Sequence, residues 1–162
     1  MKPGDTIRVV YQGDAIDRHK TSLQAWVNKK VSENRWKLAE DAPTLLRVKC
    51  NEMSEKMSLQ SIGLKGLFSD SDDVSVPFIR IHISVENKCG TVHATGLETR
   101  PKSMILKPRF GETIDSLLKD ATAFKPEMLS RLKLPATIKS VRSAWSEAGE
   151  TTIADLTIGT AD

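Results

Sequence analysis

The chain has 162 residues, of which 39% are apolar and 28% are charged, a balance that excludes wholesale disorder. This length suits one domain with its own core, so we expect a single domain over residues 1–162. The formal net charge is +3 but is uneven: residues 99–142 carry ten Lys or Arg against four Asp or Glu, and residues 143–162 carry four acids and no base. Because grouped cations attract acidic partners, residues 99–142 are the first candidate for a binding surface.

The cysteine content and the lack of long apolar segments indicate where in the cell the protein is located. Cys50 and Cys89 are the two cysteines, and they form no CxxC pair, which predicts a reducing, intracellular compartment. The first residues, MKPGDTIRVVYQGD, contain no apolar secretory segment, and no stretch approaches the roughly 20 apolar residues that span a bilayer. We therefore expect an intracellular, soluble protein, or one that sits on a membrane surface.

The N-terminal third predicts one strand and two helices. TIRVVY (6–11) is rich in β-branched residues and predicts a strand. Residues 21–24 have the S/T-x-x-E/Q form of a capping box and open a run of helical apolar spacing, which predicts a helix at about 20–32. Asp41-Ala42-Pro43 is typical of a helix start, so a helix at 43–56 is preferred, although TLLRVKC also alternates as a strand would.

The middle of the chain predicts an antiparallel hairpin. After an acidic, exposed turn at 68–73, VSVPFIRIHISVE (74–86) alternates apolar and polar residues, as a half-buried strand does. The turn Asn-Lys-Cys-Gly follows, and TVHATGL (91–97) forms the return strand. Pairing through this four-residue turn places Val92 opposite Val85, so that both apolar sets face the core.

Two of the three histidines fall in this hairpin and raise the question of a metal site. The predicted register sets His93 opposite Ser84 and His82 opposite Thr95, so the two histidines share one face, about 7–8 Å apart at Cα. A structural zinc site needs four ligands, and Cys89 lies too far along the hairpin to join them. The pattern favours a hairpin with a polar face, and we expect no metal and no cofactor.

The C-terminal part predicts further helices and a second hairpin. A long irregular connection is followed by a helix at about 112–123, a short helix PEMLSRL (126–132), and strands at 136–145 and 151–159. The apolar face of the first of these helices consists of Ile114, Leu117, Leu118 and Ala121. The whole pattern predicts an α+β fold with about five mostly antiparallel strands and three or four helices.

Sequence patterns of known catalytic centres are missing. There is no G-x-S-x-G nucleophile and no phosphate-binding glycine loop. The carboxylates of the acidic turn lie in an exposed segment, whereas acid–base catalysis needs a partly dry cleft. We expect a non-enzymatic protein without an evident small-molecule substrate, and keep an enzyme of unrecognised family as an alternative.

The segment RPKSMILKPRF (100–110) is the most suggestive, because four cations flank an apolar trio. Such a segment suits an anionic membrane surface, RNA phosphates or a neighbouring subunit. The alternative is a solvated loop whose apolar residues join the core. Together with a second basic set further along the chain, the candidate binding residues are Arg100, Lys102, Met104, Ile105, Leu106, Lys107, Arg109, Lys125, Arg131 and Lys133.

In the order of its elements, its size and its basic character, the chain resembles the matrix proteins of rhabdoviruses, especially the short ones of the plant-infecting branch. It departs from the animal-virus members in lacking a lysine-rich N-terminal arm and a P-P-x-Y or P-[ST]-A-P motif. The resemblance implies a virion structural protein that self-associates, binds the nucleocapsid and associates with the inner membrane surface. We therefore expect a homo-oligomer with an acidic partner, either an anionic membrane surface or a ribonucleoprotein. The alternative is a nucleic-acid-binding domain that uses the same basic surface.

Overall fold

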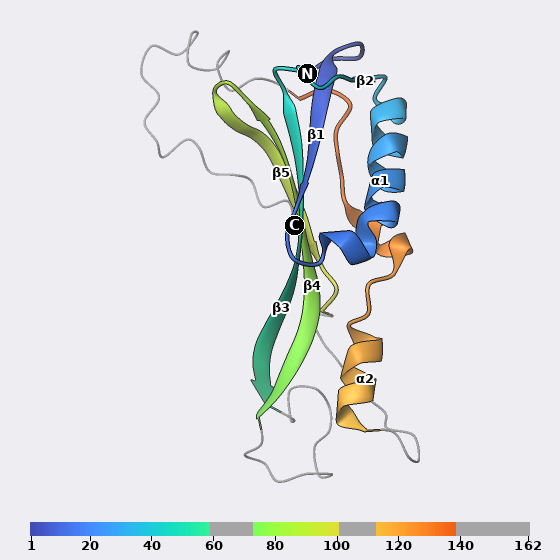
Figure 1. Ribbon diagram of the computed structural model, residues 1–162, viewed down its shortest axis with the longest axis vertical. Coiled ribbons are helices and arrows are strands. Elements are labelled where there is room, and N and C mark those ends of the chain that lie inside the picture. The colour runs from blue at the N-terminus through green and yellow to red at the C-terminus, as the bar shows by residue number, and fades with distance from the viewer. Residues whose placement is uncertain (59–72, 101–112, 139–162) are drawn as a thin grey trace.

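The computed structural model describes residues 1–58, 73–100 and 113–138. In this part of the chain, one five-stranded sheet carries all the helices on one face (Figure 1). The elements are, in chain order, β1 (Thr6–Gln12), α1 (Ile16–Glu33), β2 (Lys37–Leu38), β3 (Leu45–Ser58), β4 (Asp73–Asn87), β5 (Gly90–Glu98), α2 (Ile114–Ala121) and the 3-10 helix η1 (Pro126–Arg131). The predicted α+β class is confirmed.

The strands lie in the order β2-β1-β3-β4-β5. The antiparallel pairing of β4 with β5 was predicted. β3 also pairs antiparallel with β4, which was not predicted, and β1 pairs parallel with both β2 and β3. Pairing of β1 ends at Lys49 of β3, and pairing of β5 ends at Arg80 of β4, yet β3 and β4 stay paired as far as Ser58 and Asp73. Residues 53–58 and 73–78 therefore form a two-stranded ribbon that continues beyond the rest of the sheet.

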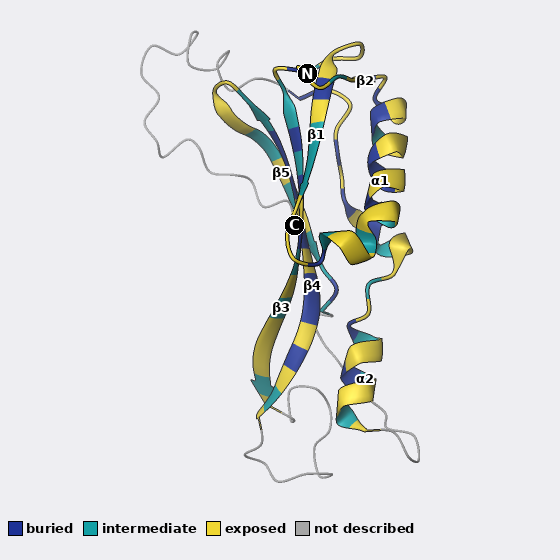
Figure 2. Cartoon of the chain, in the orientation of Figure 1, coloured by how far each residue is buried: buried dark blue, intermediate teal, exposed yellow. Residues whose placement is uncertain are grey.

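The core lies between the sheet and the helices, and Figure 2 shows the buried residues on the facing sides of both. The apolar residues of α1 recur at helical spacing and point at the sheet: Leu23, Trp26, Val27 and Val31. Alternate residues of the two central strands meet them: Leu46, Val48 and Cys50 from β3, and Ile79, Ile81, Ile83 and Val85 from β4. These predicted apolar faces of α1 and β4 are confirmed, and their removal from water is the main force that joins the two layers.

The predicted helix at 43–56 is wrong, because this segment is strand β3. Buried Leu46 and Val48 alternate with half-buried Arg47 and exposed Lys49, which is the two-residue period of a strand. Fourteen residues of β3 pair with β4, and these long-range hydrogen bonds override the local helix-start signal. The two-residue strand β2 was not predicted.

Helix α1 is present where it was predicted, but it begins earlier. It starts at Ile16, so residues 21–24 lie inside the helix and do not cap it. Its N-cap residue, Ala15, contributes no side-chain hydrogen bond. Instead, the Ala15 N–H donates to the carbonyl of Cys50 at 3.1 Å, so β3 fixes where the helix starts.

The β4–β5 hairpin is confirmed, but its register changes along its length. Glu86 pairs with Thr91, as the four-residue turn predicts, and then Val92 is left as an extra residue on β5. Beyond this bulge Val85 pairs with His93 rather than with Val92. One inserted residue therefore moves the rest of β5 by one position.

This shift separates the two hairpin histidines. His93 now lies on the helix-covered face, where its Nε2 is 3.1 Å from the carbonyl oxygen of Lys133. His82 stays exposed on the opposite, open face. The prediction that both histidines share one face is wrong, because a one-residue register shift turns every following side chain over.

The two later helices also form as predicted. α2 is capped by Thr113, whose side-chain oxygen accepts from the Ser116 N–H at 3.3 Å, and its Leu118 packs with Val76 of the ribbon. η1 follows at the predicted place, with Pro126 in its first turn. The acidic turn up to residue 72, the segment 101–112, and the predicted closing hairpin from residue 139 onward lie outside the described residues.

Candidate functional site

A cleft of about 570 Å³ lies where α1, the ribbon and the end of α2 meet. We call it the α1–α2 cleft. It forms because β1 stops pairing with β3 at Lys49, while the ribbon runs on and carries α2 further along. Its apolar lining consists of Met53, Pro77, Phe78, Ile79, Ala123 and Phe124.

The turn before α1 holds one wall of the cleft against β3. The Asp14 carboxylate accepts from the backbone N–H of Glu52 at 2.8 Å, next to the bond from Ala15 to Cys50. Gly13 lies so close to β3 that an added Cβ would stand 2.1 Å from the Cys50 carbonyl oxygen, and its φ is +114°. The first turn of α1 is thereby fixed over the cleft.

An aromatic contact forms the inner part of this wall. The imidazole ring of His19 lies 4.6 Å from the ring of Phe124, centroid to centroid, at an interplanar angle of 55°. Burial lowers the pKa of His19, and the neighbouring Arg18 lowers it further. The lowered pKa favours the neutral imidazole near pH 7, so His19 brings no charge to the cleft.

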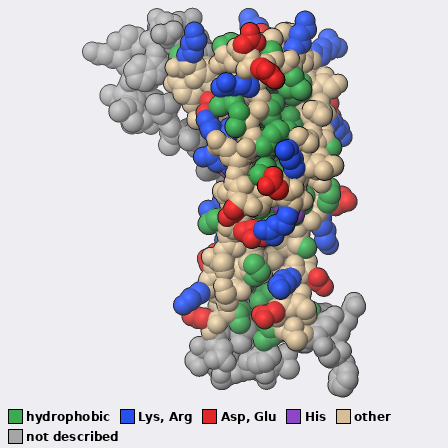
Figure 3. Space-filling model, viewed as in Figure 1, with side chains coloured by type: hydrophobic (Ala, Val, Ile, Leu, Met, Phe, Trp, Pro, Cys, Tyr) green, Lys and Arg blue, Asp and Glu red, His purple; other side chains and the backbone are tan. Residues whose placement is uncertain are grey.

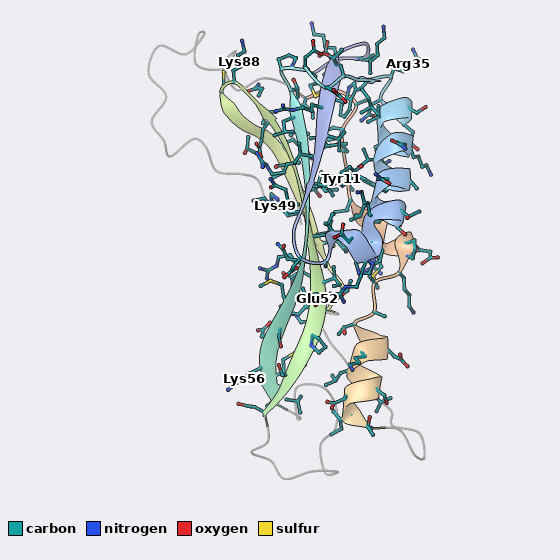
Figure 4. The ribbon with its side chains drawn as sticks, viewed as in Figure 1. Tyr11, Arg35, Lys49, Glu52, Lys56 and Lys88 are labelled. Carbon is teal, nitrogen blue, oxygen red and sulfur yellow. The ribbon has the colours of Figure 1, made fainter. Side chains whose placement is uncertain are left out.

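Charged side chains complete the lining. Arg18 forms an ion pair with Glu52, which points from β3 towards the helices (Figure 4). The hydrogen bond between them raises the pKa of Arg18 and lowers the pKa of Glu52. Lys119 of α2 also lines the cleft and has no ion pair with another described residue.

A second, smaller cleft adjoins the first. Its volume is about 180 Å³, and it shares Ser54, Pro77 and Lys119 with the α1–α2 cleft. The two volumes therefore adjoin beside the ribbon and α2. An elongated molecule fits such a shape better than a round one.

The cysteine closest to this region is not a nucleophile. Cys50 is fully buried, and desolvation, with a smaller contribution from Asp14, raises the pKa of its thiol to about 11. At neutral pH the group is a thiol, whereas the thiolate is the reactive form. Among the described residues, no three His, Cys, Asp or Glu side chains lie together as metal ligands would.

The sequence-predicted binding residues fall outside this cleft where the structure describes them. Arg100 forms ion pairs with Glu55 and Glu98, and its guanidinium lies 5.0 Å from the ring centroid of Phe78. Lys102, Met104, Ile105, Leu106, Lys107 and Arg109 lie outside the described residues. Arg100 is therefore tied into the sheet by two carboxylates.

The later basic set is exposed but mixed with acids. Lys125, Arg131 and Lys133 are all exposed, and Lys125 directly follows Phe124 of the cleft. In the view of Figure 3, cationic and anionic side chains are interspersed rather than gathered into one field. No helix among the described residues combines the length and the apolar character needed to cross a membrane.

The residues that form the cleft were not predicted as a site from the sequence. Arg18 and His19 were placed before the predicted helix, and Glu52 and Met53 were placed inside a predicted helix. The alternation in TLLRVKC was the available signal. As a strand, β3 would have been expected to run on through Glu52 beside α1.

No family model matches the chain, and no curated protein matches it. Solved structures share part of its shape. Rare lipoprotein B from Shewanella oneidensis has a TM-score of 0.42 and 13% identity, over 76% of this chain and 86% of that chain. A neuraminyllactose-binding hemagglutinin homolog from Helicobacter pylori has a TM-score of 0.36 and 9% identity, over 80% of this chain and 86% of that chain. A minor lipoprotein from Acinetobacter baumannii has a TM-score of 0.37 and 8% identity, over 78% of this chain and 84% of that chain. With TM-scores below 0.5, these similarities assign no function.

Proposed function

We propose that this protein is a non-enzymatic binding protein whose α1–α2 cleft takes an elongated amphipathic anion. Such a ligand has an aliphatic or aromatic body and one carboxylate or phosphate group. The observation that carries the proposal is a largely apolar cleft of about 570 Å³ with Lys119 in its lining. Clefts of this size suit small organic ligands, with apolar walls for affinity and a few polar groups for orientation.

The preference for an anion follows from the charges. In the lining of the cleft, Arg18 is already compensated by Glu52, whereas Lys119 forms no ion pair with another described residue. The neutral imidazole of His19 adds no charge near pH 7. The cleft therefore offers one compensating charge, which suits a ligand with a single anionic group. The negative charge of this ligand agrees with the acidic partner that was expected from the excess of basic residues at 99–142.

The preference for an elongated body follows from the shape. The adjoining cleft shares Ser54, Pro77 and Lys119, so a ligand whose anionic group meets Lys119 can extend into either cleft. Burying each methylene of an aliphatic chain contributes about 0.8 kcal/mol. Chain length should therefore govern affinity more strongly than the identity of the anionic group.

The experiment is competition against a fluorescent probe. The protein is mixed with 11-(dansylamino)undecanoate, and the probe is displaced with dodecanoate, dodecanol or dodecyltrimethylammonium at equal free concentration. Dodecanoate should displace it best, dodecanol less well, and the cationic amphiphile least. Equal displacement by all three would reduce the site to an unselective apolar surface and contradict the proposal.

Two variants with matched controls locate the site. Ala123 is exposed and lines the cleft, so Ala123→Trp should block binding, whereas Ala94→Trp, at an exposed position of β5, should not. Lys119→Ala should weaken the binding of dodecanoate but not the binding of dodecanol. Lys88→Ala, in the distant β4–β5 turn, should change neither (Figure 4).

A further inference from the structure

Among the residues that the structure describes, the outer edge of β1 is bare along most of its length. β2 pairs with β1 only at Thr6 and Ile7, and the last bond on this side runs from the Ala39 N–H to the Ile7 carbonyl at 3.1 Å. On the other side, the Arg8 N–H donates to the Thr44 carbonyl at 2.9 Å. Because the backbone groups of successive residues point to opposite edges of a strand, Val9 and Tyr11 direct their N–H and C=O groups away from β3.

An apolar groove runs beside this bare edge. It measures about 460 Å³ and separates β1 from α1, and we call it the β1–α1 groove. Its apolar lining consists of Ile7, Val9, Tyr11, Val27, Leu38 and Ala39. Figure 3 shows hydrophobic side chains gathered between β1 and α1, and Figure 4 places Tyr11 there. Leu38, in this lining, is 55% exposed.

We propose that the bare edge of β1 and the β1–α1 groove together bind an extended peptide of a partner protein, which adds to the sheet as an antiparallel strand. The backbone chemistry identifies the occupant. Two outward residues two positions apart present a donor and an acceptor each, and another extended backbone is the group that matches this repeat. The open stretch from Arg8 to Gln12 spans five residues, about 16 Å of strand.

The groove specifies the side chains of that peptide. Val9 and Tyr11 point their side chains to the helix-covered face, and the peptide residues directly opposite them point the same way. Those residues should be apolar, because they enter the groove next to Val27 and Leu38. The residues between them face the open side and can be polar. The ligand class is an extended segment that alternates apolar and polar residues.

A second copy of this chain fits the edge poorly. In the symmetric register that sets Val9 against Tyr11 of the second copy, the residues opposite Ile7 and Thr6 would be its Gly13 and Asp14. Those places are already taken by β2, which pairs there with β1. A register centred on Tyr11 avoids this conflict but matches only one residue pair. A partner peptide does not continue into the turn at Gly13 and Asp14, so it avoids the conflict with β2 and can pair with both Val9 and Tyr11.

The first test is hydrogen exchange of the free full-length protein by NMR. The amide of Val10 points to β3 and should be protected, whereas the amides of Val9 and Tyr11 should exchange fast. Slow exchange at Val9 and Tyr11 in the free protein would mean that the edge is already covered, and would overturn the proposal. On binding a peptide, both amides should become protected.

The second test measures binding of a fluorescein-labelled heptapeptide of alternating Val and Thr by fluorescence anisotropy. Backbone N-methylation of the Val residues should weaken binding by about tenfold or more, because it removes hydrogen bonds to β1, and N-methylation of the Thr residues should not. Weaker binding after N-methylation of the Thr residues alone would overturn the antiparallel orientation and indicate a parallel strand at the same edge. An equal effect of both sets, or no binding of the unmodified peptide, overturns strand addition.

A protein variant completes the test. Val9→Pro removes an outward N–H that β3 does not use, so it should lower the affinity for the peptide by about tenfold. A melting curve should show that the variant is still folded. Leu38→Asp changes the groove without touching the β1 backbone and should also weaken the peptide. If both folded variants bind as tightly as wild type, the edge is not the site. Dodecanoate binding by the α1–α2 cleft should be unchanged in both, which separates this result from that of the proposed function.

Discussion

The Asp14 carboxylate accepts a hydrogen bond from the backbone N–H of Glu52 at 2.8 Å, just past the point where β1 stops pairing with β3. This contact replaces the missing strand neighbour of β3 with the turn that starts α1. It also sets Arg18 beside the Glu52 side chain. The geometry of the α1–α2 cleft thus depends on a turn of three residues, and that turn can be tested directly.

Gly13→Ala should destabilise the protein by about 1–3 kcal/mol, because φ is +114° there and the new Cβ would meet the backbone of Cys50. Gly4→Ala is the matched control, since Gly4 has φ +95° but nothing within 4 Å of its Cβ position. Urea unfolding of both variants gives the difference. An equal loss in the two would mean that the close approach to β3 contributes nothing.

Arg35→Gly should raise the free energy of unfolding by about 0.5–1 kcal/mol. Arg35 has φ +55° and ends α1 in a Schellman motif: the Trp36 N–H bonds to the Val31 carbonyl at 2.9 Å, and the Arg35 N–H bonds to Ser32 at 3.0 Å. Glycine adopts this conformation without the steric cost of a Cβ. The control is Arg35→Ala, which keeps the Cβ and should give no gain in thermal or urea unfolding.

Stability should fall in acid through Glu86. Arg47 donates to both carboxylate oxygens at 2.9 and 2.8 Å and, with Ser84, lowers the pKa of Glu86 from 4.5 to about 2. A pKa that is lower in the folded state stabilises the protein above pH 4.5, and this contribution is lost as the pH falls from 4.5 to about 2. Wild type should therefore lose more stability across this range than Glu86→Gln, in which no group titrates at that position. Parallel losses would assign the acid sensitivity to other carboxylates.

One thiol should react quickly and the other only after unfolding. Cys89 is exposed in the β4–β5 turn, whereas Cys50 is buried and the pKa of its thiol is raised to about 11. Ellman's reagent at neutral pH should release one equivalent rapidly and the second on addition of denaturant. Cys89→Ser should abolish the fast phase. A fast phase that persists in this variant would show that Cys50 is accessible and reactive.

The sequence predicts the elements whose signal is local and periodic. The spacing of Leu23, Trp26, Val27 and Val31 predicts α1, and the alternation along 74–86 predicts β4, and both are confirmed. β3 was misassigned because Pro43 carries a local helix signal while the pairing with β4 is long-range. The register of β5 was missed beyond Val92 because a single bulge leaves no mark in the composition.

The candidate site was harder to predict than the fold. Its residues come from four separate segments and share no motif, so only the packing of α1 and α2 against the ribbon brings Arg18, Glu52 and Lys119 together. The binding segment predicted from charge lies mostly outside the described residues. Several expectations about the protein therefore stay predictions: self-association, binding to a nucleocapsid, nucleic acid or membrane, and the matrix-like role. The intracellular location also stays a prediction.

The central claim is that the α1–α2 cleft binds an amphipathic anion, and an NMR titration of the full chain with dodecanoate tests it most directly. The account predicts saturable shifts of the amides of Lys119, Ala123 and Phe124 and of the ring signals of His19, which line the cleft. The amides of Lys88, in the distant β4–β5 turn, and of Thr91, at the start of β5, should not move. Ala123→Trp should remove the shifts. Shifts that do not saturate, or that centre on residues away from the cleft, would contradict the account.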